Sequence, residues 1–139
     1  MSETLAVERW IHGTLAGDPV MQGMLSDPDG AVRVFRTTVP QGRGFPAVLY
    51  AREEDGVPVY AQPSTLCYIR FTYRVWAVLN SPGVSTLEVV RDRAFALLQG
   101  ASSERVLLCQ RIRTYTPEPV VEAGVHYSRL GDVYEIWAR

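Results

Sequence analysis

The chain contains no lysine: all 14 basic residues in its 139-residue sequence are arginine. Fifteen acidic residues nearly balance them, so the formal net charge is −1. A chain without excess positive charge lacks the bulk attraction to nucleic acid and acidic membranes that basic proteins have. Because the arginine side chain is a planar fork, every cation is suited to pair with carboxylates and to stack on aromatic rings at interfaces.

Cysteine is also scarce. Cys67 and Cys109 are too few for a disulfide framework and form no C-x-x-C pair, which favours a reducing environment. Together with His12 and His126 they are the only soft metal ligands in the sequence, and none lies at the spacing of a zinc site. We therefore expect no metal site and no cofactor. We expect both cysteines to be small residues in or near the core.

Signatures of catalysis are absent as well. The sequence has no G-x-S-x-G, no H-E-x-x-H and no glycine-rich phosphate loop after a strand. The acidic run Glu53, Glu54 and Asp55 could bind a hard cation, but a solvated turn is the simpler interpretation. We expect no catalytic residues and a protein that is not an enzyme, with a small enzyme of unrecognised site as a remote alternative.

Long apolar runs are missing too. No stretch approaches the ~20 apolar residues that span a bilayer. The N-terminal MSETLAVERW has no basic start followed by an apolar run, so it does not resemble a signal peptide. We expect a protein made in the cytoplasm, without membrane contact, as a single domain over residues 1–139. With 47% hydrophobic residues, such a domain can form its core without a disulfide or a metal.

Hydrophobic periodicity predicts an α+β fold. Asp18 is the expected N-cap and Pro19 the first-turn residue of a short second helix, while Ser85 and Glu88 form an S-x-x-E capping box for a later one. Gly100 is expected to end that later helix. The expected architecture is a mostly antiparallel sheet of about five strands, packed by an N-terminal helix and by a helix between the third and fourth strands. The expected helices cover about 4–16, 19–25 and 85–99, and the expected strands about 31–39, 47–53, 65–79, 104–115 and 125–138.

Arginine alternates with aromatic residues in the strand YIRFTYRVWAV at 68–78. Alternation places one set on the core face, beneath a helix: Cys67, Ile69, Phe71, Tyr73, Val75 and Ala77. The other face carries Tyr68, Arg70, Thr72, Arg74 and Trp76. A solvated face and an RNA-binding face are both possible, but the pattern lacks the glycines of an RNA-recognition strand. We favour a protein contact face, because Tyr, Trp and Arg are enriched at interface hot spots.

Two further strands extend this face. In 104–115 the alternation groups on one side Arg105, Leu107, Cys109, Arg111, Arg113 and Tyr115. In 125–138 it groups Tyr127, Arg129, Val133, Glu135 and Trp137. We expect the non-helical face of the sheet to contact another subunit, with Glu135 pairing the charges. The predicted contact residues are Tyr68, Arg70, Arg74, Trp76, Arg111, Arg113, Glu135 and Trp137.

Two connections, EEDGVPVYAQPS and TPEPVVEAG, are longer than usual hairpin loops. Long loops in small domains are usually functional or mobile. We favour arms that become ordered on neighbouring subunits, with disordered excursions as the alternative. The predicted loop contacts are Glu53, Glu54, Asp55, Tyr60, Glu118 and Val121.

Several pieces of the sequence resemble one known family. An N-terminal helix leads into LAGDPVMQGMLSD and RVFRTTVPQGRGFPAVLYARE, a long aromatic strand precedes LEVVRDRAFALLQG, and the chain ends in DVYEIWAR. This order, over nearly the whole chain, is similar to the tail-terminator or tail-completion proteins of long-tailed bacteriophages and gene transfer agents. The most telling pieces are the step to FPAVLY and the final alternating strand.

The resemblance implies a virion protein of the tail or neck without chemistry of its own. Such a protein forms a homohexameric ring that caps the finished tail tube, contacts the tail-tube protein and offers a surface to the head-side connector. DNA passes through its lumen without sequence-specific binding. The alternatives are a head-completion, stopper or other neck protein of the same particle and, from another class, a nucleic-acid-binding module using Arg70 and Arg74.

Overall fold

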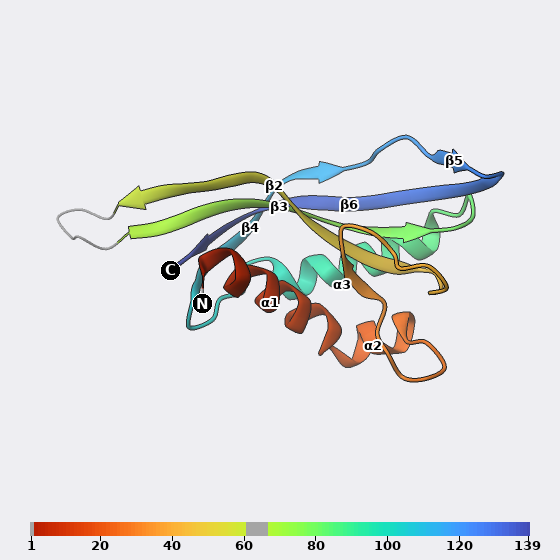
Figure 1. Cartoon of the computed structure of the whole chain (residues 1–139), viewed down its shortest axis with the longest axis horizontal. Helices are drawn as coiled ribbons and strands as arrows, with labels where there is room; N and C mark the ends of the chain where they lie inside the picture. Colours follow the sequence, from red (N-terminus) through yellow and green to blue (C-terminus); the bar gives the residue numbers. More distant parts are fainter. Residues whose placement is uncertain (1, 61–66) are drawn as a thin grey trace.

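A computed structural model describes residues 2–60 and 67–139, and these form three helices and six strands around one sheet (Figure 1). In chain order the elements are α1 (Glu3–Ala16), α2 (Pro19–Leu25), β1 (Val34–Arg36), β2 (Ala47–Tyr60), β3 (Cys67–Leu79), α3 (Ser85–Leu98), β4 (Val106–Tyr115), β5 (Val120–Glu122) and β6 (Val125–Ala138). The predicted α+β class, and a helix between the third and fourth strands, are confirmed.

The strand order is β1-β2-β3-β6-β4, and β5 pairs with β6. All pairings are antiparallel except that of β1 with β2. The helices lie together on one side of the sheet, and we call the other side the open face (Figure 1). The β2–β3 and β5–β6 hairpins extend at opposite ends of the molecule.

The starts of the helices follow the expected chemistry in two cases of three. Ser2 Oγ accepts a hydrogen bond from the Leu5 amide at 3.2 Å, and Asp18 Oδ2 accepts one from the Met21 amide at 3.0 Å. The capping box expected at α3 is wrong: Ser85 is the first helical residue, and Val84 caps the helix without a side-chain bond. Among the described helices, none combines the length and apolar character that crossing a bilayer requires.

Alternation along β3 separates two apolar layers. Phe71, Tyr73 and Val75 belong to the main core beneath the helices. Trp76 and Val78 point to the open face and form a second, smaller cluster there. The faces predicted for β3 and β6 are confirmed, and both faces of the sheet centre are buried within the chain.

β2 is much longer than predicted, because the segment taken as a loop continues the strand. Val57 pairs with Arg70 and Pro58 with Ile69, after register shifts between Arg52 and Val57. Proline lacks the N–H that a central strand needs, but β2 is an edge strand beyond its pairing with β1. Bulges and an edge position therefore let turn-forming residues remain in a strand. β1, in contrast, is shorter than expected, since Thr37 takes φ 68° and leaves the extended conformation.

The second predicted loop contains β5, a strand that the sequence pattern did not reveal. Glu122 pairs with Val125, so that only Ala123 and Gly124 connect β5 to β6. Their φ values of 50° and 79° are those of a tight mirror-image hairpin turn, whose twist matches that of the strands. The last residues of the first predicted loop, 61–64, lie outside the described residues, and the contacts predicted for both loops with neighbouring subunits stay a prediction.

The β6 backbone lies close to β3 at Gly131, where a Cβ would lie 2.2 Å from the Val75 carbonyl oxygen and 2.5 Å from Trp76 Cα. We expect Gly131→Ala to lower the free energy of unfolding by about 1–3 kcal/mol, because backbone atoms cannot move aside as a flexible side chain can. Urea unfolding measures this. The matched control is Gly23→Ala in α2, where no atom lies within 4 Å of the added Cβ. An unchanged midpoint for Gly131→Ala would contradict the close approach.

Candidate subunit-contact surface

One carboxylate joins two arginines across the open face. Arg74 of β3, Val133 of β6 and Arg113 of β4 lie side by side in register. Glu53 of β2 accepts a bond from Arg74 Nη2 on one oxygen at 3.2 Å and from Arg113 Nη2 on the other at 2.5 Å. Val133 is fully buried beneath this bridge. The bridge is a polar cover over the middle of the sheet.

Tyr115 and a third arginine extend this group. The Tyr115 hydroxyl accepts from Arg74 Nη1 at 3.3 Å and from Arg129 Nη1 at 3.4 Å. The Arg74 guanidinium also lies 4.5 Å from the Tyr115 ring centroid and 5.5 Å from that of Trp76, within range of cation–π attraction. We call Glu53, Arg74, Arg113, Tyr115 and Arg129 the arginine cluster. Its three cations face a single carboxylate, so it keeps a local positive charge.

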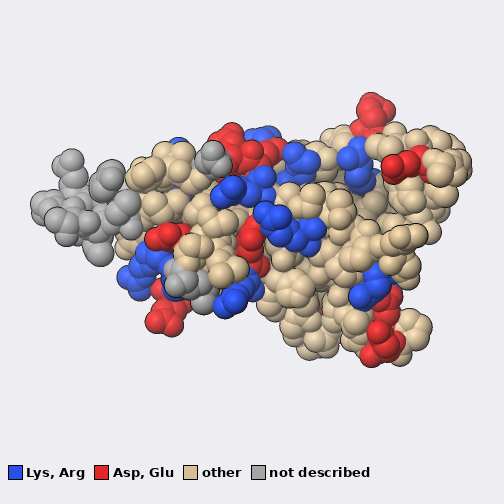
Figure 2. Space-filling model, viewed as in Figure 1, with Lys and Arg blue, Asp and Glu red and all other residues tan. Residues whose placement is uncertain are grey.

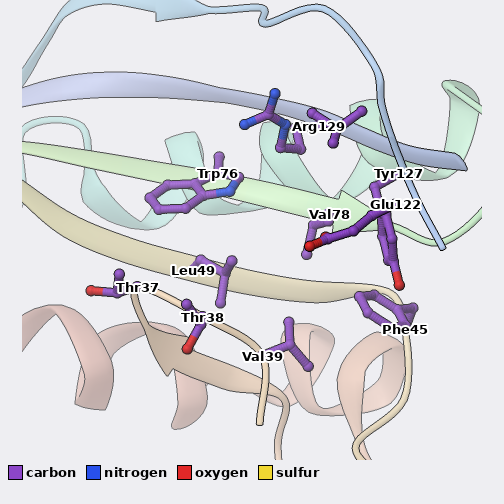
Figure 3. Close-up of a pocket in the computed structure, with 11 residues that line it drawn as sticks. Thr37, Thr38, Val39, Phe45, Leu49, Trp76, Val78, Glu122, Tyr127 and Arg129 are labelled. Carbon is purple, nitrogen blue, oxygen red and sulfur yellow. The ribbon is translucent and has the colours of Figure 1, made fainter. Parts of the chain in front are cut away.

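A groove of about 350 Å³ lies next to the arginine cluster (Figure 3). Its floor is apolar and consists of Leu49, Trp76 and Val78. The segment 37–45 forms one wall and the β5–β6 hairpin the other, with Phe45 and Tyr127 in ring contact at 5.7 Å between centroids. Arg129 belongs to both the groove and the arginine cluster, so charge and apolar surface adjoin here.

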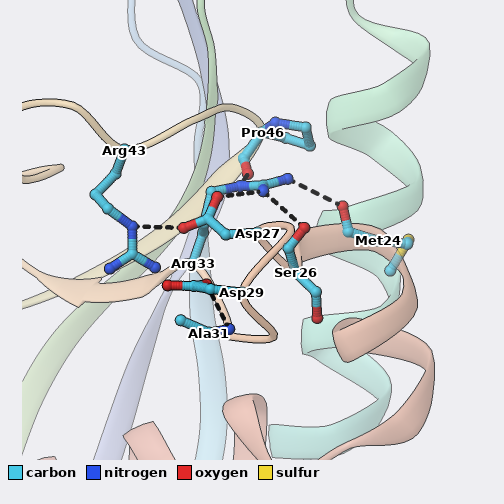
Figure 4. Close-up of polar contacts among 8 residues, drawn as sticks. All are labelled: Met24, Ser26, Asp27, Asp29, Ala31, Arg33, Arg43 and Pro46. Carbon is cyan, nitrogen blue, oxygen red and sulfur yellow. Dashed lines mark hydrogen bonds and ion pairs between the residues drawn. The ribbon is translucent and has the colours of Figure 1, made fainter.

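A buried arginine, Arg33, anchors the 37–45 segment, which forms one wall of the groove (Figure 4). Arg33, 8% exposed, donates from Nε to the Pro46 carbonyl at 2.8 Å and from Nη1 to Asp27 Oδ1 at 2.8 Å. Arg43 Nε donates to the other oxygen of Asp27 at 2.5 Å. Hydrogen bonds from Arg33, then from Arg43, lower the pKa of the Asp27 carboxyl below its usual value.

The predicted contact residues of β3 separate by exposure. Arg70 is exposed, Tyr68 is half-buried, and Arg74 is partly exposed within the arginine cluster. Trp76 differs from expectation: it is 7% exposed, because the second apolar cluster covers its ring, and Tyr115 contacts it edge-on. Its indole therefore offers almost no surface to a partner.

Arg111 lies on the opposite face from the one predicted. It stacks on Phe95 of α3, with its guanidinium 4.2 Å from the ring centroid, and its Nη1 lies 3.4 Å from Asp132 Oδ1. The cause is a register shift between Arg111 and Arg113, which reverses the alternation within β4. Arg113 consequently remains on the open face.

The carboxylate that pairs with the open-face arginines is also not the predicted one, Glu135. Glu135 accepts a hydrogen bond from Trp137 Nε1 at 2.5 Å, and both side chains are half-buried. Glu53, predicted as a loop residue, takes the pairing role instead. Glu53 follows the alternation of Ala47, Leu49 and Ala51, which lie on the open face, and it lies at the register shift between Arg52 and Glu54.

The remaining loop candidates lie mainly in strands. Glu54 is exposed in β2, and Val121 is 60% exposed in β5. Glu118 is exposed, and its carbonyl accepts from Arg129 Nη2 at 3.0 Å. The backbones of Asp55 and Tyr60 belong to β2, and their side chains lie outside what the structure describes.

Sequence reasoning missed the groove and the part that Phe45 takes in its wall. Tyr115, Tyr127 and Arg129 had been placed on the open face by alternation, but nothing local indicated that the 37–45 segment would fold across them. The one available signal was Phe45, a large aromatic residue in a segment otherwise rich in glycine and proline. Such a residue has to be covered somewhere.

Metal-binding and nucleophilic groups were sought among the described side chains. No cluster of three or more His, Cys, Asp or Glu side chains suited to a metal occurs among the described residues. Cys109 is fully buried, and burial raises the pKa of its thiol to about 12. It therefore remains a protonated, poorly nucleophilic thiol near neutral pH.

Comparison with known proteins gives a fold. No protein-family model and no curated protein matches the chain. Among solved structures, it is similar to a chain in the virion of a native gene transfer agent particle, with 16% sequence identity and a TM-score of 0.67. The match covers 92% of this chain and 90% of that chain. At such low identity the likeness shows a shared fold, on which function can vary.

Asp27 should make stability depend on pH. Because its pKa is lowered by folding, its contribution is complete above the unfolded value near ~4 and is lost as the pH falls through the folded value. We expect Asp27→Asn to be less stable than the wild type at pH 7 and this difference to shrink below pH ~4. Urea midpoints from pH 7 to pH ~2.5 test this. Asp29→Asn leaves both Asp27 ion pairs in place and should retain the wild-type pH dependence. A stability difference between Asp27→Asn and the wild type that stays constant with pH would contradict the prediction.

Trp76 should matter for folding. We expect Trp76→Ala to lower the free energy of unfolding by about 3–5 kcal/mol, because it opens a cavity beneath the 37–45 segment. Arg70 is exposed and lies in the same strand, β3. We expect Arg70→Ala to change the free energy of unfolding by about 0.5 kcal/mol or less. Chemical unfolding followed by tryptophan fluorescence and circular dichroism provides the comparison. Equal stability of the two variants would mean that the indole is not part of the folded core.

Proposed function

We propose that this chain is a structural protein of a tailed, phage-like particle and that it forms a ring on the end of the tail tube. The observation that carries the proposal is the shared fold with a chain of a gene transfer agent virion, over nine-tenths of both chains. The sequence resemblance to tail terminators points to the same class of particle. In this role the protein ends tube growth at the head–tail junction and allows joining to the head connector.

The charge distribution suits a subunit that lines or borders a DNA passage. Among the open-face arginines, Arg74 and Arg113 donate to Glu53, so their charge is partly neutralised within the chain. On the face shown in Figure 2, acidic and basic side chains lie close to one another in small groups on a largely uncharged surface. A ring of such subunits would not hold DNA by the phosphate contacts that give basic proteins their affinity.

The proposed partners follow from this position. Copies of the chain form the ring, expected to be a hexamer, the tail-tube protein binds one side of it, and a head-side connector or stopper protein binds the other. The protein would then reside in the virion, in the neck of the particle. It performs no chemistry in this role, because a ring stops polymerisation by covering the binding surface of the last tube subunits.

Tube growth in vitro tests the proposal. Tail-tube protein of the same particle is polymerised alone or with substoichiometric amounts of this chain, and tube lengths are measured by negative-stain electron microscopy. We expect shorter tubes that carry a ring at one end, since one ring blocks one growing end. Thermally unfolded chain is the control. Unchanged lengths with bare ends would refute the terminator role, and nanomolar DNA binding at moderate salt would favour a nucleic-acid-binding module.

A further inference from the structure

The Arg129 guanidinium, which lines the groove on the open face, is bound only by neutral oxygens. Its Nη1 donates to the Tyr115 hydroxyl at 3.4 Å and its Nη2 to the Glu118 carbonyl at 3.0 Å. Arg129 is half-buried, and no carboxylate of the described residues lies within ion-pair distance of it. Five other buried or half-buried arginines each bind a carboxylate: Arg33, Arg43, Arg74, Arg91 and Arg93.

Hydrogen-bond donors converge beside this guanidinium. The Nε atoms of Arg129 and Arg74 are both buried and have no acceptor within the described part of the chain. Between them, the Tyr115 hydroxyl accepts from Arg74 at 3.3 Å and from Arg129, so its own proton is left to donate. The nearby carboxylate of Glu53 is already bound by Arg74 and Arg113. A desolvated cation without a counter-ion is costly, and a carboxylate from outside the chain would offset that cost.

The groove beside Arg129 is apolar. Its floor is formed by Leu49, Trp76 and Val78 of the second apolar cluster. Its walls keep exposed surface, since Thr38 is exposed and Val120 is 39% exposed. With about 350 Å³ the groove lies at the small end of the ~300–1,000 Å³ that ligand sites span. It therefore has room for one or two side chains.

The charge of the groove lining differs from place to place. Phe45 and Tyr127 close one end by their ring contact, and Glu122 lies beside Tyr127 there (Figure 3). Glu122 is the one acidic residue of the described lining, and it makes no ion pair with Arg129. A carboxylate from a partner would be attracted at Arg129 and repelled near Glu122. The lining thus suits a single acidic group beside an apolar one, and it does not suit an acidic run.

We infer that the groove binds an extended segment of a partner protein in which one aspartate or glutamate lies within two residues of a large apolar residue. The apolar side chain packs on Leu49, Trp76 and Val78, and the carboxylate accepts hydrogen bonds from Arg129 and the Tyr115 hydroxyl. A protein segment fits better than a small molecule, because small-molecule sites enclose ~70–90% of their ligand and these walls are exposed. The contact stands on the groove alone and holds whether or not the chain forms a ring.

Peptide display on the full chain tests this contact. A library of random short peptides is selected on the immobilised wild type and, in parallel, on Arg129→Gln. We expect only the wild-type selection to enrich an acidic residue within two positions of a leucine, isoleucine, phenylalanine or tryptophan. The most enriched peptide is then synthesised with a fluorescent label, and its Kd is measured by fluorescence polarisation.

The Kd values form a double-mutant cycle. Arg129→Gln in the protein and the acid-to-amide change in the peptide should each raise Kd by about tenfold, since each removes a charge-assisted hydrogen bond. Both changes together should raise Kd no further, because they remove the same bond. The matched control is Arg70→Gln, an exposed open-face arginine outside the groove lining, which should leave Kd unchanged.

A second variant tests the groove without altering Arg129. Thr38→Trp places an indole in the groove and should abolish peptide binding, whereas Thr86→Trp at an exposed position of α3 should not. Circular dichroism verifies that each variant is folded. A selection without enrichment, enriched peptides that lack an acidic residue, or equal affinity of the wild type and Arg129→Gln would overturn the inference and leave the terminator proposal intact.

Discussion

β3 is hydrogen-bonded along most of its length on both sides, to β2 and to β6. Because strand side chains alternate between faces, this double pairing places Tyr73 and Val75 beneath the helices and Trp76 on the open face at once. Gly131 allows the β6 backbone to lie against Trp76. A slip of one residue would exchange the two layers, so the register of β3 determines both where the helices pack and where the groove forms.

Arginine takes over the long-range polar contacts of a chain that lacks lysine. Arg91 of α3 holds Asp132 of β6 with two bonds, at 3.0 and 3.2 Å, and the Asp132 side chain is only 2% exposed. Arg93 holds Asp18, the cap of α2, in the same way. Removing one partner of such a pair would leave a desolvated charge, which is more costly than the pair is stabilising. These two arginines therefore serve folding.

The open face is largely covered by its own chain, through the 37–45 segment and the arginine cluster, whereas β4 and β5 leave aliphatic side chains exposed. Edge strands are usually protected against association by charges, bulges or proline. β2 carries such protection at Pro58 and at its register shifts, and β4 carries it at its own register shifts and at Arg111 and Arg113.

The sequence by itself determined the α+β class, the order of the three helices and of every strand but β5, the Asp18 cap and the faces of β3 and β6. Each of these depends on local chemistry or on a period of 2 or 3.6 residues. Only the tertiary structure decided that β2 continues through a predicted loop, that Arg111 turns to the helix side and that Trp76 is covered. Those outcomes depend on bulges, on edge position and on the 37–45 segment folding over distant strands. A bulge adds one residue to one strand and reverses every later side chain, and neighbours along the chain do not specify it.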